Sequence, residues 1–178
     1  ITLSKNYATH LGINDKEFLD LGANISDDEK EIISNSDLLI QVGLISDEKI
    51  SLLKENQSII GVLNPYGNKD KLLNLAKKKI NSFSLELLPR ITRAQSMDIL
   101  SSQANLAGYK AVIESFANYK KAIPMMMTAA GTIPAAKVLV VGAGVAGLQA
   151  IATAKRMGAI VYATDVRMAS KEQVESLG

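Results

Sequence analysis

The chain has 178 residues, of which 47% are hydrophobic and 21% are charged, a balance typical of globular domains. Its net charge of +2 is too small to suggest a nucleic-acid-binding protein. The lack of cysteine excludes disulfides, thiolate metal sites and cysteine nucleophiles, and we expect no metal site. No apolar run approaches the roughly 20 residues that a membrane-spanning helix needs.

Short apolar strands and short amphipathic helices alternate over the first half of the chain. Strands are predicted at residues 1–3, 38–42, 58–63 and 80–85, and helices at 27–34, 46–54 and 68–79. Ser26 and Glu29 have the spacing of a capping box, and the lysines at 77–79 are expected to complement the dipole of their own helix. Strands separated in this way predict βαβ units with a parallel sheet, here an N-terminal α/β subdomain over residues 1–92.

One long helix is predicted after Pro89, over residues 93–121, ending before Pro124. It carries two apolar stripes, and its small residues would allow another element to approach closely. These small residues are Ala104, Ala107, Gly108 and Ala111. We therefore expect residues 93–123 to connect two subdomains.

The same helical wheel predicts a polar stripe within an arc of about 120°. Its members are Gln95, Asp98, Ser101, Ser102 and Asn105, with Arg90 in the turn ahead of the helix. A solvated face is the alternative explanation, but solvated faces usually favour Lys and Glu, whereas Ser, Asn and Asp are weaker helix formers. The stripe is therefore a candidate functional surface.

A second subdomain, residues 124–178, begins with a connector at 125–136 and a strand at 138–141, whose unbroken apolar run suits burial on both faces. Gly142, Gly144 and Gly147 follow the strand, and a helix at 148–157 is predicted to end at Gly158. A further strand at 160–163 leads to Asp165, 18 residues after Gly147. This order of strand, glycine turn, helix, strand and acid is the dinucleotide-binding fingerprint.

Each residue of the fingerprint has a physical task. Gly142 permits the tight turn, Gly144 lets the backbone approach a pyrophosphate, and Gly147 allows the helix to pack closely on the strand. The N–H groups at the helix start receive the phosphate charge. Asp165 is predicted to accept hydrogen bonds from the adenosine ribose, which favours NAD over NADP, although Arg167 nearby could hold a 2′-phosphate.

Residues 89–109, 129–137, 141–147 and 165–167 resemble the NAD(H)-binding component of the Re/Si-specific, proton-translocating NAD(P)+ transhydrogenases, which are related to the alanine dehydrogenases. The resemblance implies direct hydride transfer between NADH on this chain and NADP+ on a partner domain, coupled to proton translocation. It also implies an NADP(H)-binding domain and a membrane domain as partners, and a homodimer of this component. The implied location is the cytoplasmic or matrix face of an energy-coupling membrane, most simply a bacterial inner membrane.

The resemblance also assigns site residues. It places Arg90, Gln95, Asp98 and Ser101 around the nicotinamide as catalytic and cofactor-binding residues. Arg90 would contact NAD(H) and pair with Asp98, Gln95 would reach toward the partner's dinucleotide, and Ser101 would support the nicotinamide. The remaining cofactor-binding residues are Gly142, Ala143, Gly144, Val145 and Gly147 in the turn, and Asp165, Val166 and Arg167 beyond the second strand.

Two other functions remain open. An alanine dehydrogenase-like enzyme would need a general base, typically His or Lys. The single histidine, His10, is far from the fingerprint, and residues 60–65 offer neither His nor Lys. A non-catalytic NAD-binding module is the other alternative, although such a module has no need for the polar stripe.

The predicted fold class is therefore α/β, with two Rossmann-like parallel-sheet subdomains joined by a long helix. Ile1 stands in place of an initiating methionine, and the fingerprint region supplies two of the about six strands usual for its fold. We therefore expect the chain to be a fragment with a truncated nucleotide subdomain.

Overall fold

The computed structural model describes residues 1–178, and the chain divides into two compact units, Ile1–Met97 and Asp98–Gly178. Parallel strands connected by helices occur in both units, so the predicted α/β class with Rossmann-like parallel sheets is confirmed. None of the helices combines the length and the hydropathy that a membrane crossing requires.

Unit 1 opens with β1 (Thr2–Ser4), a 3-10 helix (Thr9–Leu11), α1 (Asp15–Asp20) and β2 (Asn24–Ser26). β1 and β2 pair in parallel, and the strand predicted at residues 1–3 is found one residue later. β2 and α1 have no counterpart in the prediction from sequence. β2 is three residues long and contains one apolar residue, Ile25, which is too short a pattern to read as a strand.

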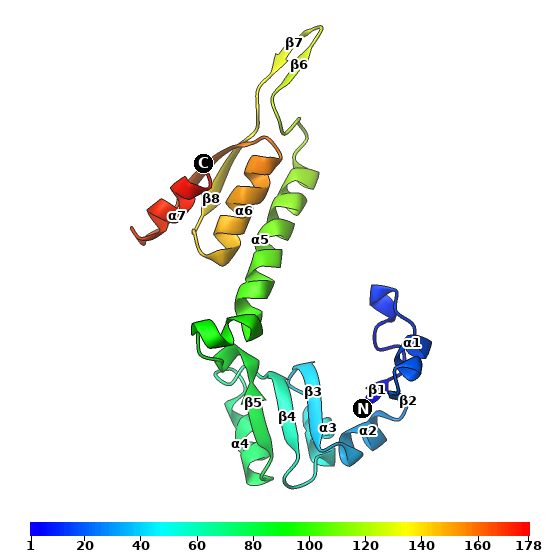
Figure 1. Ribbon diagram of the computed structural model, residues 1–178. Helices are drawn as coiled ribbons and strands as arrows, with labels where there is room; N and C mark the ends of the chain where they lie inside the picture. The colour runs from blue at the N-terminus through cyan, green and yellow to red at the C-terminus, as the bar shows by residue number, and fades with distance from the viewer. The chain divides into compact units, whose positions relative to one another are not determined.

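A three-stranded parallel sheet follows, with the strand order β3-β4-β5 (Figure 1). Its strands and connecting helices are β3 (Leu38–Gly43), α3 (Asp47–Leu52), β4 (Ser58–Val62), α4 (Lys69–Lys77) and β5 (Asn81–Ser84). In the register, Leu38 lies opposite Ser58, and Ser58 lies opposite Asn81. All five elements lie where the sequence predicts them, and the βαβ prediction is confirmed.

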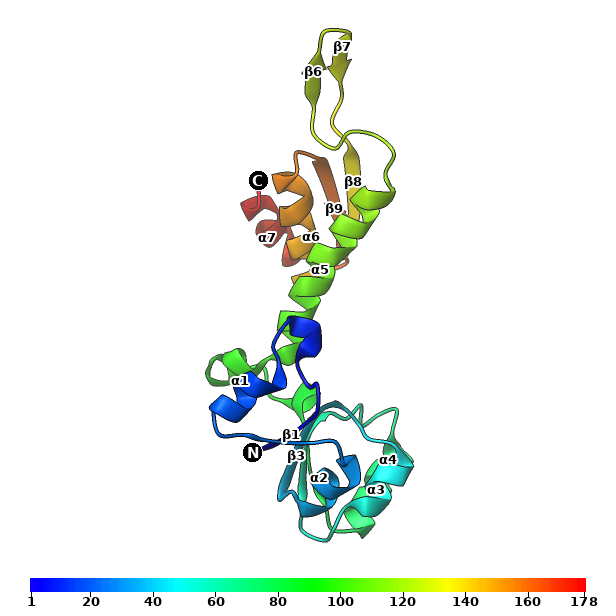
Figure 2. The same ribbon diagram turned by 90° about the vertical axis from the view of Figure 1, so that its right-hand side faces the viewer.

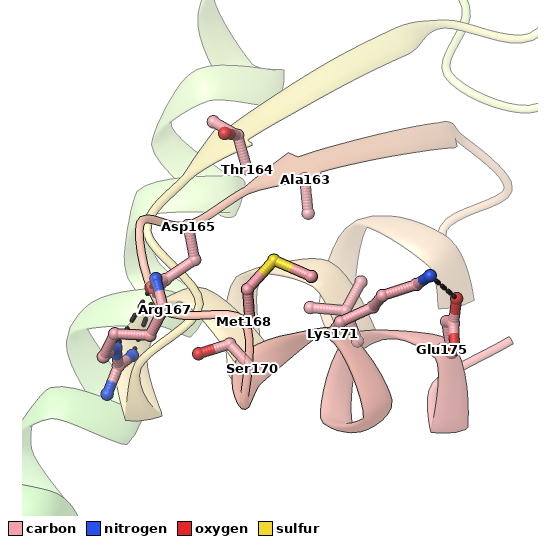
Figure 3. A pocket seen from close by; sticks show the side chains of 9 residues that line it. Ala163, Thr164, Asp165, Arg167, Met168, Ser170, Lys171 and Glu175 are labelled. Atoms are coloured by element: carbon pink, nitrogen blue, oxygen red, sulfur yellow. Dashed lines mark hydrogen bonds and ion pairs between the residues drawn. The ribbon is translucent and has the colours of Figure 1, made fainter.

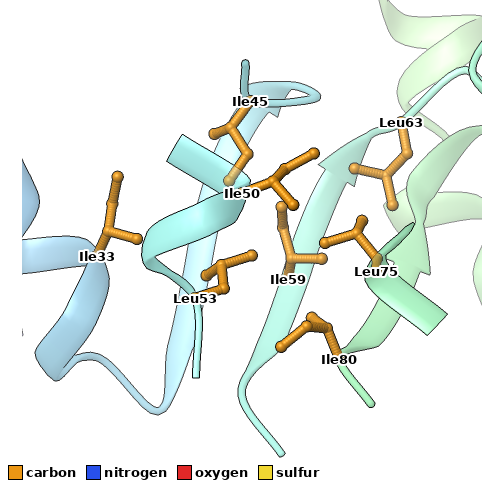
Figure 4. Close-up of a cluster of buried hydrophobic side chains, with 8 residues drawn as sticks. All are labelled: Ile33, Ile45, Ile50, Leu53, Ile59, Leu63, Leu75 and Ile80. Atoms are coloured by element: carbon orange, nitrogen blue, oxygen red, sulfur yellow. The ribbon is translucent and has the colours of Figure 1, made fainter. Parts of the chain in front are cut away.

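The core of unit 1 is built from branched aliphatic side chains (Figure 4). Ile59 of β4 packs among Ile50 of α3 and Leu75 of α4, and none of the three has any exposed surface. β4 is the central strand of the sheet, so helices on either side of it in sequence bury its apolar face. The other members of this core are Ile33, Ile45, Leu53, Leu63 and Ile80.

Two of the predicted terminal interactions of helices are wrong. α2 (Glu29–Asn35) is capped by Asp28, whose carboxylate accepts hydrogen bonds from the N–H groups of Lys30 and Glu31. The Ser26–Glu29 capping box does not form, because Ser26 is the last residue of β2 and Glu29 pairs with Lys49.

Lys78 departs from its predicted role in a similar way. Its Nζ donates to the carbonyl oxygens of Ile50, Ser51 and Leu53, at 3.0, 2.8 and 3.3 Å. It therefore stabilises the C-terminal end of α3 and not the end of its own helix. Lys79 also leaves the helix, since it takes a positive φ of 58° and pairs with Glu55.

Unit 2 contains the predicted strand–turn–helix–strand order, as β8 (Lys137–Val141), α6 (Val145–Arg156), β9 (Ile160–Thr164) and then α7 (Ser170–Ser176). β8 and β9 pair in parallel along their whole length. Val138, Val140 and Val161 pack against a core that includes Ala150 and Ala154 of α6.

The prediction that the strand at 138–141 is buried on both faces is wrong. Leu139 is 66% exposed and Val141 is 79% exposed, whereas the alternate side chains Val138 and Val140 pack against the core. Successive side chains of a strand point to opposite faces, and the helices of unit 2 bury one of them.

α5 (Ile99–Asn118) packs side by side with α6 (Figure 2). A Cβ at Gly108 would lie 2.0 Å from the carbonyl oxygen of Ala146, so the close approach predicted from small residues is confirmed at Gly108. The predicted start of this helix is wrong. Residues 92–97 form a separate 3-10 helix, and α5 begins only after its N-cap, Asp98.

The connector predicted at residues 125–136 contains an antiparallel hairpin, β6 (Met126–Thr128) and β7 (Gly131–Ile133). Gly131 adopts a φ of 125°, which is open to glycine and strained for other residues. The hydroxyl of Thr128 donates to the carbonyl of Gly131 at 2.9 Å and accepts from the N–H of Ala130. Side chain and glycine together close the turn, a signal that the Pro- and Gly-containing sequence did not make evident.

Candidate nucleotide-binding site

The glycine turn joins the end of β8 to the start of α6. Gly142 has a φ of 95°, in the left-handed region that favours glycine. Its N–H donates to the carbonyl of Thr164 at 2.7 Å, which ties the turn to the end of β9. The chain can therefore reverse immediately after β8, and α6 begins at Val145, three residues earlier than predicted.

Gly147 and Gly144 meet different surroundings. A Cβ at Gly147 would lie 1.8 Å from the carbonyl oxygen of Gly142, so this glycine is required by packing. Gly144 has φ −79° and ψ −168°, an extended conformation that any residue adopts. The one atom near a Cβ at Gly144 is Nη2 of Arg167, at 4.0 Å. Nothing within the chain requires glycine at position 144.

The first turn of α6 has no acidic residue, and its N-cap, Gly144, offers no side chain to accept from the helix N–H groups. The N–H groups at the start of a helix have no partner within the helix, and together with the helix dipole they favour an anion. Main-chain N–H groups therefore supply the polar surface of this turn. Val145 is 42% exposed at its start.

Asp165 holds the turn from the other side. One carboxylate oxygen, Oδ2, accepts from the N–H of Ala143 at 2.7 Å, and the other, Oδ1, accepts from the N–H of Arg167 at 2.8 Å. The guanidinium of Arg167 donates through Nε to Oδ1 at 3.0 Å and through Nη2 to Oδ2 at 3.1 Å (Figure 3). These donors, led by the Arg167 side chain, hold the pKa of the Asp165 carboxyl well below its ordinary value.

A hollow of about 330 Å³ lies beside this ion pair. Asp165 and Arg167 line one side of it, and α7 lines the other with an ion pair between Lys171 and Glu175 (Figure 3). Val166, a predicted site residue, is fully exposed between the two members of the pair. The structure therefore brings the glycine turn, Asp165 and Arg167 together at one end of the two-stranded sheet.

The predicted nicotinamide residues fall on both sides of the unit boundary. Arg90 and Gln95 are exposed in unit 1, Gln95 on the 3-10 helix. Asp98 and Ser101 lie in unit 2 and are in contact, because Asp98 accepts from the N–H and the hydroxyl of Ser101, at 3.0 and 2.6 Å. The idea of one helical stripe carrying Gln95 and Asp98 is wrong, while the convergence of all four residues stays a prediction.

Arg90 follows a segment that is fixed by Glu86. The Glu86 carboxylate accepts from the hydroxyl of Ser84 at 2.7 Å and from the N–H groups of Leu63 and Asn64, just after β4. Burial opposes ionisation of this carboxyl, but the hydrogen bonds outweigh it and lower the pKa of Glu86. Sequence reasoning missed this contact, because no local spacing relates Glu86 to residues 23 positions away.

Asn105, in the predicted polar stripe, has a structural contact. Its amide donates to Oε1 of Gln149 at 3.2 Å, between α5 and α6. Gln149 in turn donates to the hydroxyl of Thr153, one helical turn further along. This part of the stripe therefore faces α6 and not solvent, which the helical wheel alone could not distinguish.

Replacing Asp98 by alanine is expected to lower the free energy of unfolding by about 1 kcal/mol, because α5 loses its N-cap. Asparagine caps almost as well as aspartate, so the matched Asp98→Asn variant should unfold close to the unmodified protein. Urea unfolding followed by circular dichroism measures both. Equal destabilisation by both substitutions would show that the charge of Asp98, and not its cap, stabilises the chain.

Parallel sheets, the glycine turn and the acid after β9 define an α/β protein of the Rossmann-like, nucleotide-binding class. Residues 2–107 match the family described as "Alanine dehydrogenase/PNT, N-terminal domain", and residues 111–178 match "Alanine dehydrogenase/PNT, C-terminal domain". The chain belongs to the alanine dehydrogenase/PNT family.

The chain is 50% identical over 182 residues to the first part of a divided NAD(P) transhydrogenase subunit alpha of Rickettsia prowazekii, covering 100% of this chain and 48% of that protein. It is 52% identical over 171 residues to the protein of the same name in Rhodospirillum rubrum, covering 93% of this chain and 44% of that protein. The chain thus spans about half the length of these curated relatives.

Solved structures agree with these relationships. The crystal structure of transhydrogenase from Sinorhizobium meliloti matches with a TM-score of 0.92 and 50% identity, covering 99% of this chain and 53% of that one. An L-alanine dehydrogenase matches with a TM-score of 0.80 at 18% identity, covering 99% of this chain and 49% of that one. The second match shows a shared fold.

Proposed function

We propose that the chain belongs to the NAD(H)-binding component of an NAD(P)+ transhydrogenase. It would take part in direct hydride transfer between NADH and NADP+ held on a partner domain, coupled in the whole enzyme to proton translocation. The observation that carries this proposal is the glycine turn of a chain about 50% identical to transhydrogenase subunits.

The residues of the turn fit a dinucleotide. Gly142 is required by its φ, Gly147 by its packing, and Gly144 by neither. A backbone that is open at Gly144 leaves the space in which a pyrophosphate would meet the N–H groups of α6. We infer that glycine at position 144 serves the ligand and not the fold.

Asp165 supports the choice of NAD(H) for this chain and of NADP(H) for the partner. Its side chain is 10% exposed and carries its charge down to low pH, because the Arg167 guanidinium and two backbone N–H groups lower its pKa. An ionised carboxylate at the end of β9 can accept from the ribose hydroxyls and repels a 2′-phosphate.

The nicotinamide supplies the hydride, and the residues of this chain would position it. Arg90, Gln95, Asp98 and Ser101 are proposed to surround the ring, with Ser101 oriented by its hydrogen bond to Asp98. Transfer between two nicotinamides moves no proton at the reacting carbons, so it depends on alignment and exclusion of water.

An alanine dehydrogenase is the weaker alternative. Its reaction requires a general base, whereas His10, the single histidine, is exposed on the 3-10 helix of unit 1. The chain is 25% identical to an alanine dehydrogenase of Methanococcus maripaludis, half its identity to the transhydrogenase subunits. Sequence distance and the lack of a candidate base both favour the transhydrogenase.

The names of the two bacterial relatives denote the first portion of a divided alpha subunit, which implies further portions of the same enzyme. We propose that these include an NADP(H)-binding domain and a membrane domain, and that this component acts as a homodimer. The assembly would lie on the cytoplasmic or matrix face of an energy-coupling membrane, in bacteria the inner membrane.

Shortening Gln95 to asparagine tests the proposed reaction in the whole protein mixed with its NADP(H)-binding partner. Catalysis by alignment loses about a hundredfold in rate for a displacement of about 1 Å. We therefore expect Gln95→Asn to slow single-turnover hydride exchange from NADH to an NADP+ analogue tenfold or more, about 1.4 kcal/mol. The affinity for NADH should stay close to normal.

Gln103→Asn is the matched control, because Gln103 is exposed on α5 and outside the predicted site. It should leave the exchange rate unchanged. If the unmodified protein binds NADH but exchanges no hydride with the NADP+ analogue, the transhydrogenase assignment is wrong. If Gln95→Asn weakens NADH binding and leaves the saturated rate intact, Gln95 binds the ground state only.

A further inference from the structure

The acceptor positions of the Asp165 carboxylate are all occupied within the chain. An ionised carboxylate offers about four lone-pair sites for hydrogen bonds. Each oxygen of Asp165 already accepts two: Oδ1 from the N–H and the Nε of Arg167, and Oδ2 from the N–H of Ala143 and the Nη2 of Arg167. A ribose cannot add further hydrogen bonds unless one of these donors leaves.

The four donors differ in how easily they can leave. The two backbone N–H groups are fixed, because Ala143 is buried in the glycine turn and Arg167 is part of the chain after β9. The two side-chain donors belong to one guanidinium, whose side chain is 61% exposed. Arg167 makes its ion pair with Asp165 alone, and an exposed ion pair contributes about 1 kcal/mol or less.

The guanidinium also matches the ribose in its pattern of donors. Nε and Nη2 present two parallel N–H groups, one to each carboxylate oxygen. The vicinal 2′- and 3′-hydroxyls of a ribose present two O–H donors to the same pair of oxygens. Nη2 of Arg167 lies 4.0 Å from the position of a Cβ on Gly144, so the guanidinium stands beside the turn where the nucleotide is expected.

We propose that Arg167 occupies the ribose positions on Asp165 in the nucleotide-free protein, and that NAD(H) binds by displacing its guanidinium. This inference rests on the proposed function. Arg167 thereby acts as a specificity residue: when a ligand lacks the ribose hydroxyls, the guanidinium stays and keeps Asp165 satisfied. The exchange makes the protein tolerant of a deoxyribose, because the buried carboxylate is never left without donors.

The test compares two ligands and three proteins in full-length form. The ligands are NADH and its analogue with a 2′,3′-dideoxy adenosine half. The proteins are the unmodified chain, Arg167→Gln, and the control Arg156→Gln at the exposed end of α6. We expect the ratio of the two dissociation constants to be about threefold or more larger in Arg167→Gln than in the other two proteins. A ratio that is equal or smaller in Arg167→Gln overturns the proposal.

A second measurement uses the unmodified protein alone. The Nε–H resonance of Arg167, assigned by its absence in Arg167→Gln or, if that variant fails to fold, in Arg167→Lys, should shift when NADH saturates the protein. It should keep its position with the dideoxy analogue. An unchanged resonance at saturating NADH overturns the displacement, whereas a protein that does not bind NADH overturns the proposed function itself.

Discussion

Replacing Gly147 by alanine is expected to destabilise unit 2 by about 3 kcal/mol or more, at the upper end of the cost of overpacking. The added Cβ would lie 1.8 Å from the carbonyl oxygen of Gly142 and 2.8 Å from its carbonyl carbon. Both are main-chain atoms of the turn, so no change of rotamer can relieve the contact. α6 would have to move away from β8, against which it packs.

Thermal and urea unfolding measure this loss directly. Gly144→Ala is the matched control, since the same methyl group three residues earlier meets no atom closer than 4.0 Å. Its backbone angles are also open to alanine. An unchanged unfolding midpoint for Gly147→Ala would mean that α6 can shift without cost.

Gly144→Val is expected to have the opposite profile: a stable fold and a loss of NADH binding of at least about a hundredfold. The extended backbone at Gly144 accepts a branched residue, and the nearest atom is the end of the flexible Arg167 side chain. The valine methyl groups would occupy the space through which the pyrophosphate approaches the helix N–H groups.

Circular dichroism and NADH fluorescence titration of the whole protein separate the two effects. Gly43→Val serves as control, because a Cβ at Gly43, at the end of β3, meets nothing within 4 Å. We expect it to bind NADH normally. Near-normal affinity in a folded Gly144→Val protein would show that the turn does not contact the nucleotide.

The elements that sequence predicted best are those with a strong local pattern. β4, β8 and β9 are continuous apolar runs, and the glycines after β8 can serve few other purposes. α3 and α4 were predicted because polar N-cap residues and acids precede an apolar face. The strand–turn–helix–strand order, and with it the position of the candidate site, follows from these local signals.

The failures have a different physical origin. Asp98 was read as one position of a helix, although aspartate ahead of an apolar run is also an N-cap signal. Whether residues 92–97 join α5 or form a separate 3-10 helix depends on that cap. The occupied carboxylate of Asp165 depends on the conformation of Arg167 and on a backbone N–H 22 residues away, which no periodicity encodes.

The three consecutive lysines at residues 77–79 differ in chemical reactivity because of the contacts made by Lys78. Its ammonium has three N–H donors, and its contacts are the three carbonyls of Ile50, Ser51 and Leu53 at the end of α3. Lys77 is exposed, and Lys79 is exposed in a surface ion pair with Glu55. Three identical side chains therefore have three different environments.

Acylation of these amines has correspondingly different consequences. An acyl group on Lys77 or Lys79 removes a surface charge from a side chain that is accessible in the folded protein. On Lys78 it removes the charge and leaves one N–H, so at least two carbonyls at the end of α3 lose their donor. An acylating reagent thus reaches the Lys78 amine only when the ends of α3 and α4 separate, and the rate of that reaction reports on the opening of unit 1.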